Sequence, residues 1–347
     1  MSTEFDPNAC PPADAGIFGL PFTPEESALV LVPVPWDVTT SYRPGTSKGP
    51  GAILAASHQL DVFDIDLGEP WRAGIAMVPP EGAYESLNIS ARKDAEKVIA
   101  VGGRVKGNRD LEAALARVND ACGKVNDMVY GAVDRWLKAG KIVGLVGGDH
   151  STPFGAIKRI AEANPGMGVL HIDAHADLRD AYEGFVWSHA SIMFNVVKKI
   201  PQVSSLVQVG IRDVCTFEAE MIENSNGKIR TFYDMRLADR RNAGEPWSEQ
   251  VEEIVASLPQ ELYISFDIDG LDPSFCPNTG TPVPGGLHFY QAVSLLKAVV
   301  QSGRKIVGFD LNEVAPGASA NGDEWDANVG GRILYKLCGW TLKSQRR

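Results

Sequence analysis

The feature that most restricts the fold of this chain is a regular alternation of short apolar runs with longer segments of helical periodicity. The apolar runs have the length of strands buried on both faces, and they occupy residues 28–34, 142–146, 168–172, 206–211, 229–233, 262–266 and 306–310. The helical segments occupy residues 51–58, 110–138, 153–163, 188–199, 247–257 and 289–301. This rhythm predicts an α/β protein with a mostly parallel central sheet and helices on both faces.

The domain organisation follows from length and from the composition of the first residues. Residues 1–27 are rich in proline, glycine and acidic residues, so they are expected to form an extended arm that covers a neighbouring chain or a site entrance. Residues 28–342 are expected to form one domain, because α/β folds of this length often form a single unit.

Composition and charge exclude several classes of partner. The chain has 33 Lys+Arg against 44 Asp+Glu, for a net charge of -11, which opposes binding to nucleic acid or to anionic membranes. A small cationic substrate is the more natural partner. The five cysteines form no CxxC pair, and the chain has neither a secretory leader pattern nor a long apolar run, so a reduced, cytoplasmic protein is predicted.

Polar side chains follow three of the predicted strands, where ligands bind in parallel sheets. They are His150, Asp173, His175, Asp177, Asp267 and Asp269. The i, i+2 spacing places those of one segment on the same side of an extended chain, so they can converge. Four carboxylates buried together would repel one another, and a pair of divalent cations resolves that conflict.

Mixed imidazole and carboxylate ligands suit Mn, Ni, Co, Fe or Zn better than Mg or Ca. Two such ions acidify a shared water enough for it to act as a nucleophile near neutral pH. A single histidine after Gly-Gly-Asp is more often a loop residue, and a single Asp-x-Asp is more often a turn. The three segments together favour a binuclear metal site.

These segments resemble the signature blocks of the ureohydrolase family, which includes arginase, agmatinase and guanidinobutyrase. The blocks are residues 147–151, 173–177 and 265–273, and the likeness runs from about residue 30 to 337. The resemblance implies a three-layer α/β/α, arginase-like fold, in which residues 28–342 form a single catalytic domain. It also implies a manganese pair in most members and frequent trimers or hexamers.

The same resemblance assigns the metal ligands. It implies that His150 and Asp177 bind one metal ion, and that His175 and Asp269 bind the other. Asp173 and Asp267 would bridge the two ions.

The resemblance also implies residues that act on a guanidinium-like substrate. His189 resembles the proton shuttle or general acid, and Glu313 resembles the carboxylate that clamps the guanidinium. Asp177 is counted with them as a catalytic residue. Thr281 matches a position whose hydroxyl faces the substrate, although a turn-capping threonine is nearly as consistent with the sequence. Cys276 is expected to be a buried bystander.

The substrate is the least constrained point. The arm, residues 33–45 and an insertion at residues 91–109 are more similar to guanidine hydrolase and metformin hydrolase than to arginase, which favours nickel over manganese and a small guanidine or biguanide. Trp187, with Trp36 and Tyr42, could enclose a compact cation by cation–π contact, although ordinary packing is the commoner role of such residues. Agmatine or a guanidino acid is the alternative substrate. A paralogous subunit and nickel-insertion chaperones are possible partners.

Two other classes of protein share parts of this pattern. One is a non-catalytic partner subunit, which loss of ligand residues would favour, yet every expected ligand is present. The other is a histone-deacetylase-like hydrolase with one metal, which the doubled Asp-x-Asp pattern contradicts. Metal content discriminates between these readings.

Overall fold

The central element is an eight-stranded sheet in the order β2-β1-β3-β8-β7-β4-β5-β6. The computed structural model describes residues 5–12, 14–317 and 324–345, so residues 1–4 and 13 of the expected arm lie outside the described residues. All strand pairs recorded for these residues are parallel. The strands are β1 (Leu29–Val34), β2 (Ile75–Met77), β3 (Ile142–Gly147), β4 (Gly168–Ile172), β5 (Ser205–Ile211), β6 (Ile229–Tyr233), β7 (Glu261–Asp267) and β8 (Lys305–Asn312).

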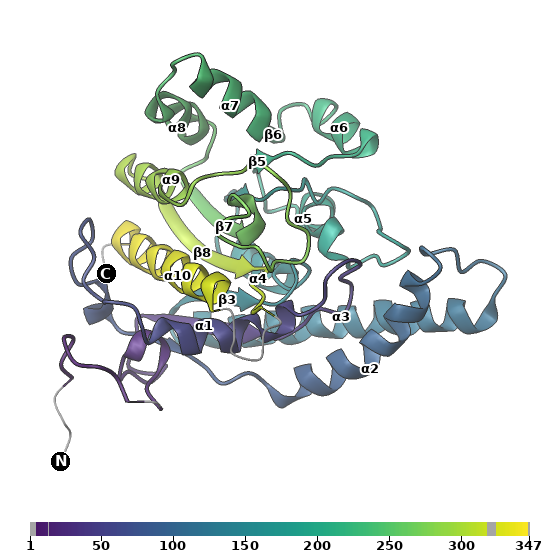
Figure 1. The fold of residues 1–347 in the computed structure, drawn as a ribbon, viewed down its shortest axis with the longest axis horizontal. Helices are drawn as coiled ribbons and strands as arrows, with labels where there is room; N and C mark the ends of the chain where they lie inside the picture. The colour runs from purple at the N-terminus through teal and green to yellow at the C-terminus, as the bar shows by residue number, and fades with distance from the viewer. Residues whose placement is uncertain (1–4, 13, 318–323, 346–347) are drawn as a thin grey trace.

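Helices connect the strands and cover both faces of the sheet (Figure 1). They are α1 (Gly49–Ser57), α2 (Gly82–Ile99), α3 (Arg109–Lys138), α4 (Phe154–Ala163), α5 (Ile192–Lys199), α6 (Thr216–Glu223), α7 (Asp234–Asn242), α8 (Trp247–Ala256), α9 (Phe289–Gln301) and α10 (Trp325–Ser344). One hydrophobic core lies between the sheet and α1, α8, α9 and α10, and the other lies between the sheet and α2, α3, α4 and α5. The expected three-layer α/β/α fold is therefore confirmed. None of the described helices is both long and apolar enough to cross a membrane.

Several elements were not predicted, and their sequences explain why. β2 is only three residues long, too short for a recognisable apolar run. Helix α10 is buried along most of its length, its polar face is only a narrow stripe of Asn328, Arg332 and Lys336, and it contains three glycines, so its sequence gives a weak helical signal. Helix α2 extends to Ile99, so the insertion expected at residues 91–109 is partly helical and its loop begins only at residue 100.

The described part of the N-terminal arm packs on the body of the same chain. Ile17, Phe18 and Leu20 are buried in the core under α1 and α10. The backbone N–H of Phe18 donates to the hydroxyl of Ser57 at 2.8 Å, and its ring meets that of Tyr335 edge to face. These contacts tie the arm to the α1 and α10 layer.

The strands that carry the expected site are neighbours in the middle of the sheet. Ser265 of β7 lies in register with both His171 of β4 and Asp310 of β8, and Asp310 lies in register with Leu145 of β3. Since all four strands run in the same direction, their carboxyl ends meet at one edge. Residues that follow β3, β4 and β7 are thereby brought together.

The backbone at Gly148, just after β3, lies close to the segments that follow β1 and β8. A Cβ atom on Gly148 would lie 1.9 Å from the carbonyl oxygen of Trp36. That oxygen accepts a hydrogen bond from the backbone N–H of Asp149 at 2.7 Å, and the Gly148 carbonyl accepts one from the N–H of Glu313 at 2.8 Å. A side chain at residue 148 must therefore displace backbone rather than a flexible group.

We expect Gly148→Ala to lower the free energy of unfolding by about 2 kcal/mol or more, because overpacking against fixed backbone is costly. Chemical denaturation measures this. Gly51→Ala is the control, because a Cβ at this helical position meets nothing within 4 Å. Equal stability of Gly148→Ala and the parent protein would contradict the proposed backbone contact.

Candidate active site

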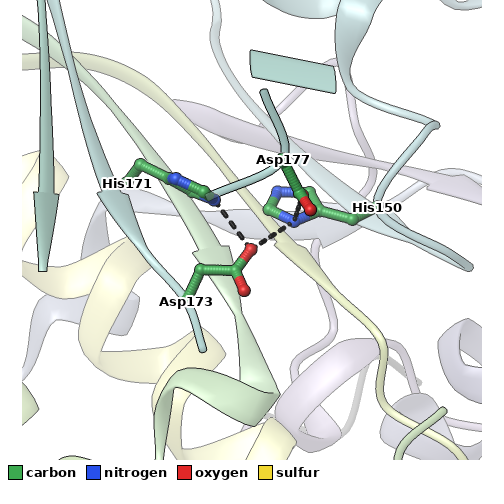
Figure 2. Close-up of side chains that lie close together, drawn as sticks. All are labelled: His150, His171, Asp173 and Asp177. Carbon is green, nitrogen blue, oxygen red and sulfur yellow. Dashed lines mark hydrogen bonds and ion pairs between the residues drawn. The ribbon is translucent and has the colours of Figure 1, made fainter. Parts of the chain in front are cut away.

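His150 lies at the centre of a buried group of carboxylates. Its Nδ1 atom is 2.9 Å from Asp173 Oδ2, 3.2 Å from Asp177 Oδ2 and 3.2 Å from Asp267 Oδ2. Figure 2 shows the side chains of His150, Asp173 and Asp177 pointing toward one another, His150 from the segment after β3 and the two aspartates from the segment after β4. The backbone positions these groups at the ends of β3, β4 and β7.

A second group shares Asp173 with the first. Nδ1 of His175 is 3.2 Å from Asp269 Oδ2 and 3.5 Å from Asp173 Oδ1. The side chain of His175 is 24% exposed, whereas that of Asp269 is 1% exposed. The structure thus brings together all six residues that were expected to hold metal, in two groups joined by one carboxylate.

The convergence does not arise from extended chain, as the i, i+2 spacing had suggested, and that part of the prediction is wrong. The chain bends at Ala174, and Asp177 has a φ of 54°, in the left-handed region, so residues 173–177 do not form one continuous extended stretch. Residues Ile268–Gly270 form a 3-10 helix, which turns Asp267 toward His150 and Asp269 toward His175. A turn in each segment therefore separates the ligands into two groups.

The residues present fit a pair of divalent cations. The four aspartates are at most 4% exposed, and no ion pair with Lys or Arg is recorded for any of them in the described part of the chain. Burial, with repulsion from neighbouring carboxylates, raises the pKa of Asp267 well above its ordinary value and that of Asp177 to about 7. Burial alone would also raise the pKa of Asp173, but three nearby histidines hold it well below its ordinary value. A cation is needed if all four are to be ionised together.

His171 belongs to the same cluster, although it was not among the expected ligands. Its Nε2 atom is 2.7 Å from Asp173 Oδ2, and the ring is fully buried (Figure 2). It could be one of four residues around a metal ion, with His150, Asp173 and Asp177. The sequence signal was its place two residues before Asp173, at the end of β4.

His189 is anchored beside the cluster through Thr39. Its backbone N–H donates to Thr39 Oγ1 at 3.2 Å, and its Nδ1 atom lies 3.4 Å from the same oxygen. The Thr39 hydroxyl in turn donates to Asp149 Oδ2 at 3.1 Å. Burial lowers the pKa of His189 to about 3, and the nearby His175 and His150 contribute to this shift.

Glu313 has one engaged and one free carboxylate oxygen. Oε1 accepts a hydrogen bond from the backbone N–H of His150 at 2.8 Å, whereas no described group donates to the buried Oε2. Burial, with repulsion from Asp149, raises the pKa of Glu313 well above its ordinary value. Its φ of 63° is left-handed, a conformation that non-glycine residues adopt at a cost and that clusters at functional sites.

The remaining expected residues divide into two sets. Thr281 Oγ1 lies 3.4 Å from Asp269 Oδ2, beside the cluster, whereas the buried Cys276 thiol donates to the carbonyl of Ile268. Trp187 is not brought to the cluster by any recorded contact, because its ring packs against Phe154 and beneath the Lys199 ammonium.

The other two aromatic residues are also engaged elsewhere. Trp36 is fully buried in the hydrophobic core. Tyr42 is 68% exposed, and its recorded cation partner is the adjacent Arg43. Among the described residues, the contacts of Trp36, Tyr42 and Trp187 therefore do not support the expected cation–π enclosure of a substrate.

We expect removal of divalent metal by a chelator to lower the melting temperature, and readdition to restore it, because a ligand at 100 times its Kd stabilises by about 2.7 kcal/mol. Asp267→Ala should weaken that response, since this carboxylate faces His150. Asp127→Ala is the control, because Asp127 is exposed on α3. Differential scanning calorimetry with and without metal measures the response, and a chelator-insensitive parent protein would contradict the metal assignment.

Comparison with known proteins agrees with this geometry. Residues 27–339 match the model of the arginase family. The N(1)-aminopropylagmatine ureohydrolase of Thermus thermophilus is 34% identical over 93% of this chain and 94% of the relative, and the guanidinobutyrase of Pseudomonas aeruginosa is 27% identical over 88% and 84%. The fold is similar to that of a hypothetical agmatinase from Burkholderia thailandensis, with a TM-score of 0.72 and 22% identity over 99% of this chain and 94% of that chain. The resemblance inferred from the three signature blocks is confirmed, and the chain belongs to the arginase family.

Proposed function

We propose that this protein is a binuclear-metal hydrolase that cleaves a C–N bond of a small guanidine or biguanide, releasing urea or a substituted urea with ammonia or an amine. The observation that carries the proposal is the free Oε2 of Glu313, a buried carboxylate oxygen without a donor beside the metal-ligand cluster. A guanidinium supplies both the positive charge and the N–H donors that such an oxygen requires.

The division of ligands between the two ions follows the two groups, whereas the bridging role of Asp267, which faces His150 in the structure, rests on the resemblance to the ureohydrolase family. His150 and Asp177 would hold one ion, His175 and Asp269 would hold the other, and Asp173 and Asp267 would contact both. When bound, a pair of divalent ions acidifies water and polarises the substrate carbon–nitrogen group. We propose nickel as the physiological metal, with manganese as the alternative.

Glu313 would orient the substrate. Because His150 N–H fixes Oε1, the carboxylate cannot rotate freely, and Oε2 stays directed at the substrate. Ionisation of Glu313 is unfavourable in its buried surroundings until a cation binds. The negative charge of Glu313 would therefore both bind the cationic substrate and fix the position of that substrate. Thr281, whose hydroxyl lies 3.4 Å from Asp269, would contact the substrate from that side.

His189 would move the proton that the departing amine requires. The single hydroxyl proton of Thr39 is donated to Asp149, so the Thr39 oxygen can only accept from His189 Nδ1. We therefore place the proton of the neutral ring on Nδ1, where Thr39 Oγ1 and Ser188 Oγ each lie at 3.4 Å and can accept it, and Nε2 is then the atom that takes up a proton and passes it on. Ionised Asp149 stabilises the positive charge on the ring through Thr39.

The choice between substrates rests on different observations. The preference for a guanidine or biguanide rests on the similarity of residues 33–45 and 91–109 to guanidine and metformin hydrolases. The Thermus relative favours a second candidate, an agmatine-like substrate, and the Pseudomonas relative favours a guanidino acid. A non-catalytic subunit is disfavoured, because all the ligand side chains are present and converge.

We further propose that residues 28–342 form the catalytic unit behind the 1–27 arm, and that it acts in the cytoplasm. The protein would assemble as a trimer or hexamer, alone or with a paralogous subunit. Nickel-insertion chaperones would supply its metal. The net charge of -11 supports a small cationic substrate rather than nucleic acid or an anionic membrane.

A substrate panel with defined metal content tests the function. Nickel- and manganese-loaded protein should release urea or a urea derivative from guanidine or metformin faster than from agmatine, guanidinobutyrate or arginine. About two metal ions per chain are expected from the two ligand groups. Turnover of agmatine alone would replace the preferred substrate with the second candidate, and one ion per chain or no turnover would overturn the binuclear hydrolase.

Glu313→Gln should reduce kcat/KM by roughly 100-fold while leaving metal content unchanged, because it removes the charge but keeps the shape. Elemental analysis and steady-state kinetics together measure this. Glu249→Gln on α8 is the control for an acidic residue elsewhere. Parental kcat/KM in Glu313→Gln would remove Glu313 from the substrate site.

Thr39→Val should lower kcat by roughly 10- to 100-fold and alter its pH profile, because the hydroxyl that links His189 Nδ1 to Asp149 is lost, while Ser188 Oγ stays 3.4 Å from Nδ1. Thr39→Ser keeps the hydroxyl and should recover most of the activity. Equal pH profiles for Thr39→Val and the parent protein would show that Thr39 has no part in proton transfer.

A further inference from the structure

We propose that His171 is a hydrogen-bond donor that positions the shared carboxylate of Asp173, and that Gln208 keeps it in that state. A chain of hydrogen bonds runs from Thr231 through Gln208 and His171 to Asp173. On this assignment His171 is not a metal ligand, despite its place in the cluster. The inference rests on the proposed metal site, although its central step concerns a tautomer that can be observed without metal.

The orientation of the Gln208 amide is determined by its surroundings. One end of the amide lies 2.8 Å from the carbonyl oxygen of Ala176, which can only accept a hydrogen bond, so this end is the NH₂ group. The other end is then the carbonyl, and it accepts from the Thr231 hydroxyl at 2.8 Å. Gln208 is fully buried, so water does not compete for these partners.

The amide determines which nitrogen of His171 carries the proton. The NH₂ group of Gln208 lies 3.0 Å from His171 Nδ1, so Nδ1 must accept and carries no proton. A neutral imidazole with a bare Nδ1 has its hydrogen on Nε2. Nε2 lies 2.7 Å from Asp173 Oδ2, to which it therefore donates. No lone pair of the ring is left for a metal ion.

This donor restrains the carboxylate that joins the two ligand groups. Oδ2 of Asp173 receives the His171 N–H and faces His150 Nδ1 (Figure 2), while Oδ1 accepts the backbone N–H of His175 at 2.6 Å. With both oxygens restrained, the plane of the Asp173 carboxylate is set before any metal binds. Such outer partners typically change metal affinity by about 10- to 100-fold.

The restraint is transmitted across the sheet. Thr231 lies on β6, Gln208 on β5 and His171 on β4, so the three side chains span neighbouring strands. Thr231 lies in register with Gln208, and Gln208 with His171. The outer strands β5 and β6 would thereby contribute to metal binding without supplying a ligand.

Gln208→Glu tests the chain of donors. A carboxylate cannot donate to Nδ1, so Nδ1 must carry a proton and donate instead. The ring then either loses its Nε2 proton, and with it the donor to Asp173, or becomes positively charged. We expect a loss of metal affinity of about 10-fold or more, measured by titration of metal-free protein with Ni²⁺ or Mn²⁺. Gln250→Glu is the matched control, because Gln250 is also fully buried and donates to a carbonyl, that of Leu237, outside the cluster. Equal affinity losses in the two variants would overturn the proposal.

The tautomer of His171 can be tested directly in the parent protein. This second test requires neither a folded variant nor bound metal. Nuclear magnetic resonance of protein with isotope-labelled histidine should show His171 protonated at Nε2 and bare at Nδ1. A proton on Nδ1 would overturn the assignment. If the parent protein binds no metal but shows the expected tautomer, the metal site fails while the hydrogen-bond chain stands. If it binds two ions and Gln208→Glu binds them equally well, the positioning role fails while the proposed function stands.

Discussion

Repulsion among the buried carboxylates at the ends of β3, β4 and β7 is the constraint around which this structure is arranged. Asp173, Asp177, Asp267 and Asp269 are almost completely removed from water, and Glu313 lies beside them. No lysine or arginine pairs with them among the described residues, and the imidazoles of His150, His171 and His175 face them. Divalent metal and a cationic substrate, as proposed above, would offset the cost of burying these charges.

The scaffold holds these groups in place through contacts behind them. On the far side of His150, Nε2 lies 2.9 Å from Ser265 Oγ, whose hydroxyl donates to Asp310 at 2.9 Å. This arrangement turns Nδ1 toward the carboxylates. On the other side of the cluster, the Gln208 and His171 pair restrains Asp173 in the same manner. Both imidazoles are thus oriented by neighbouring strands, which are rigid compared with loops.

Much of this could be predicted because it depends on local pattern. The apolar runs are strands because they are buried on both faces, and residues that follow parallel strands must share an edge of the sheet. The convergence of the six residues expected to hold metal could therefore be predicted from three short segments. Helix α10 and strand β2 could not be predicted, since α10 has only a narrow polar stripe and three glycines, and β2 is too short. The roles proposed for Thr39 and Gln208 could not be predicted from the sequence, because they depend on distant partners. Thr39 contacts His189, 150 residues away along the chain, and Gln208 contacts His171, 37 residues away.

By itself, the sequence determined the parallel α/β architecture and the edge of the sheet at which the chemistry-bearing side chains gather, and the types of those side chains suit a metal site. Only the tertiary structure decided which ligands form which group, since Asp177 leaves the extended conformation and Asp267 and Asp269 diverge across a 3-10 turn. It also decided that Trp187 packs under Lys199, and that His171 donates to Asp173. The physical reason is that residue type and spacing specify what a side chain can bind, whereas the direction in which it points depends on turns and on buried partners from distant strands.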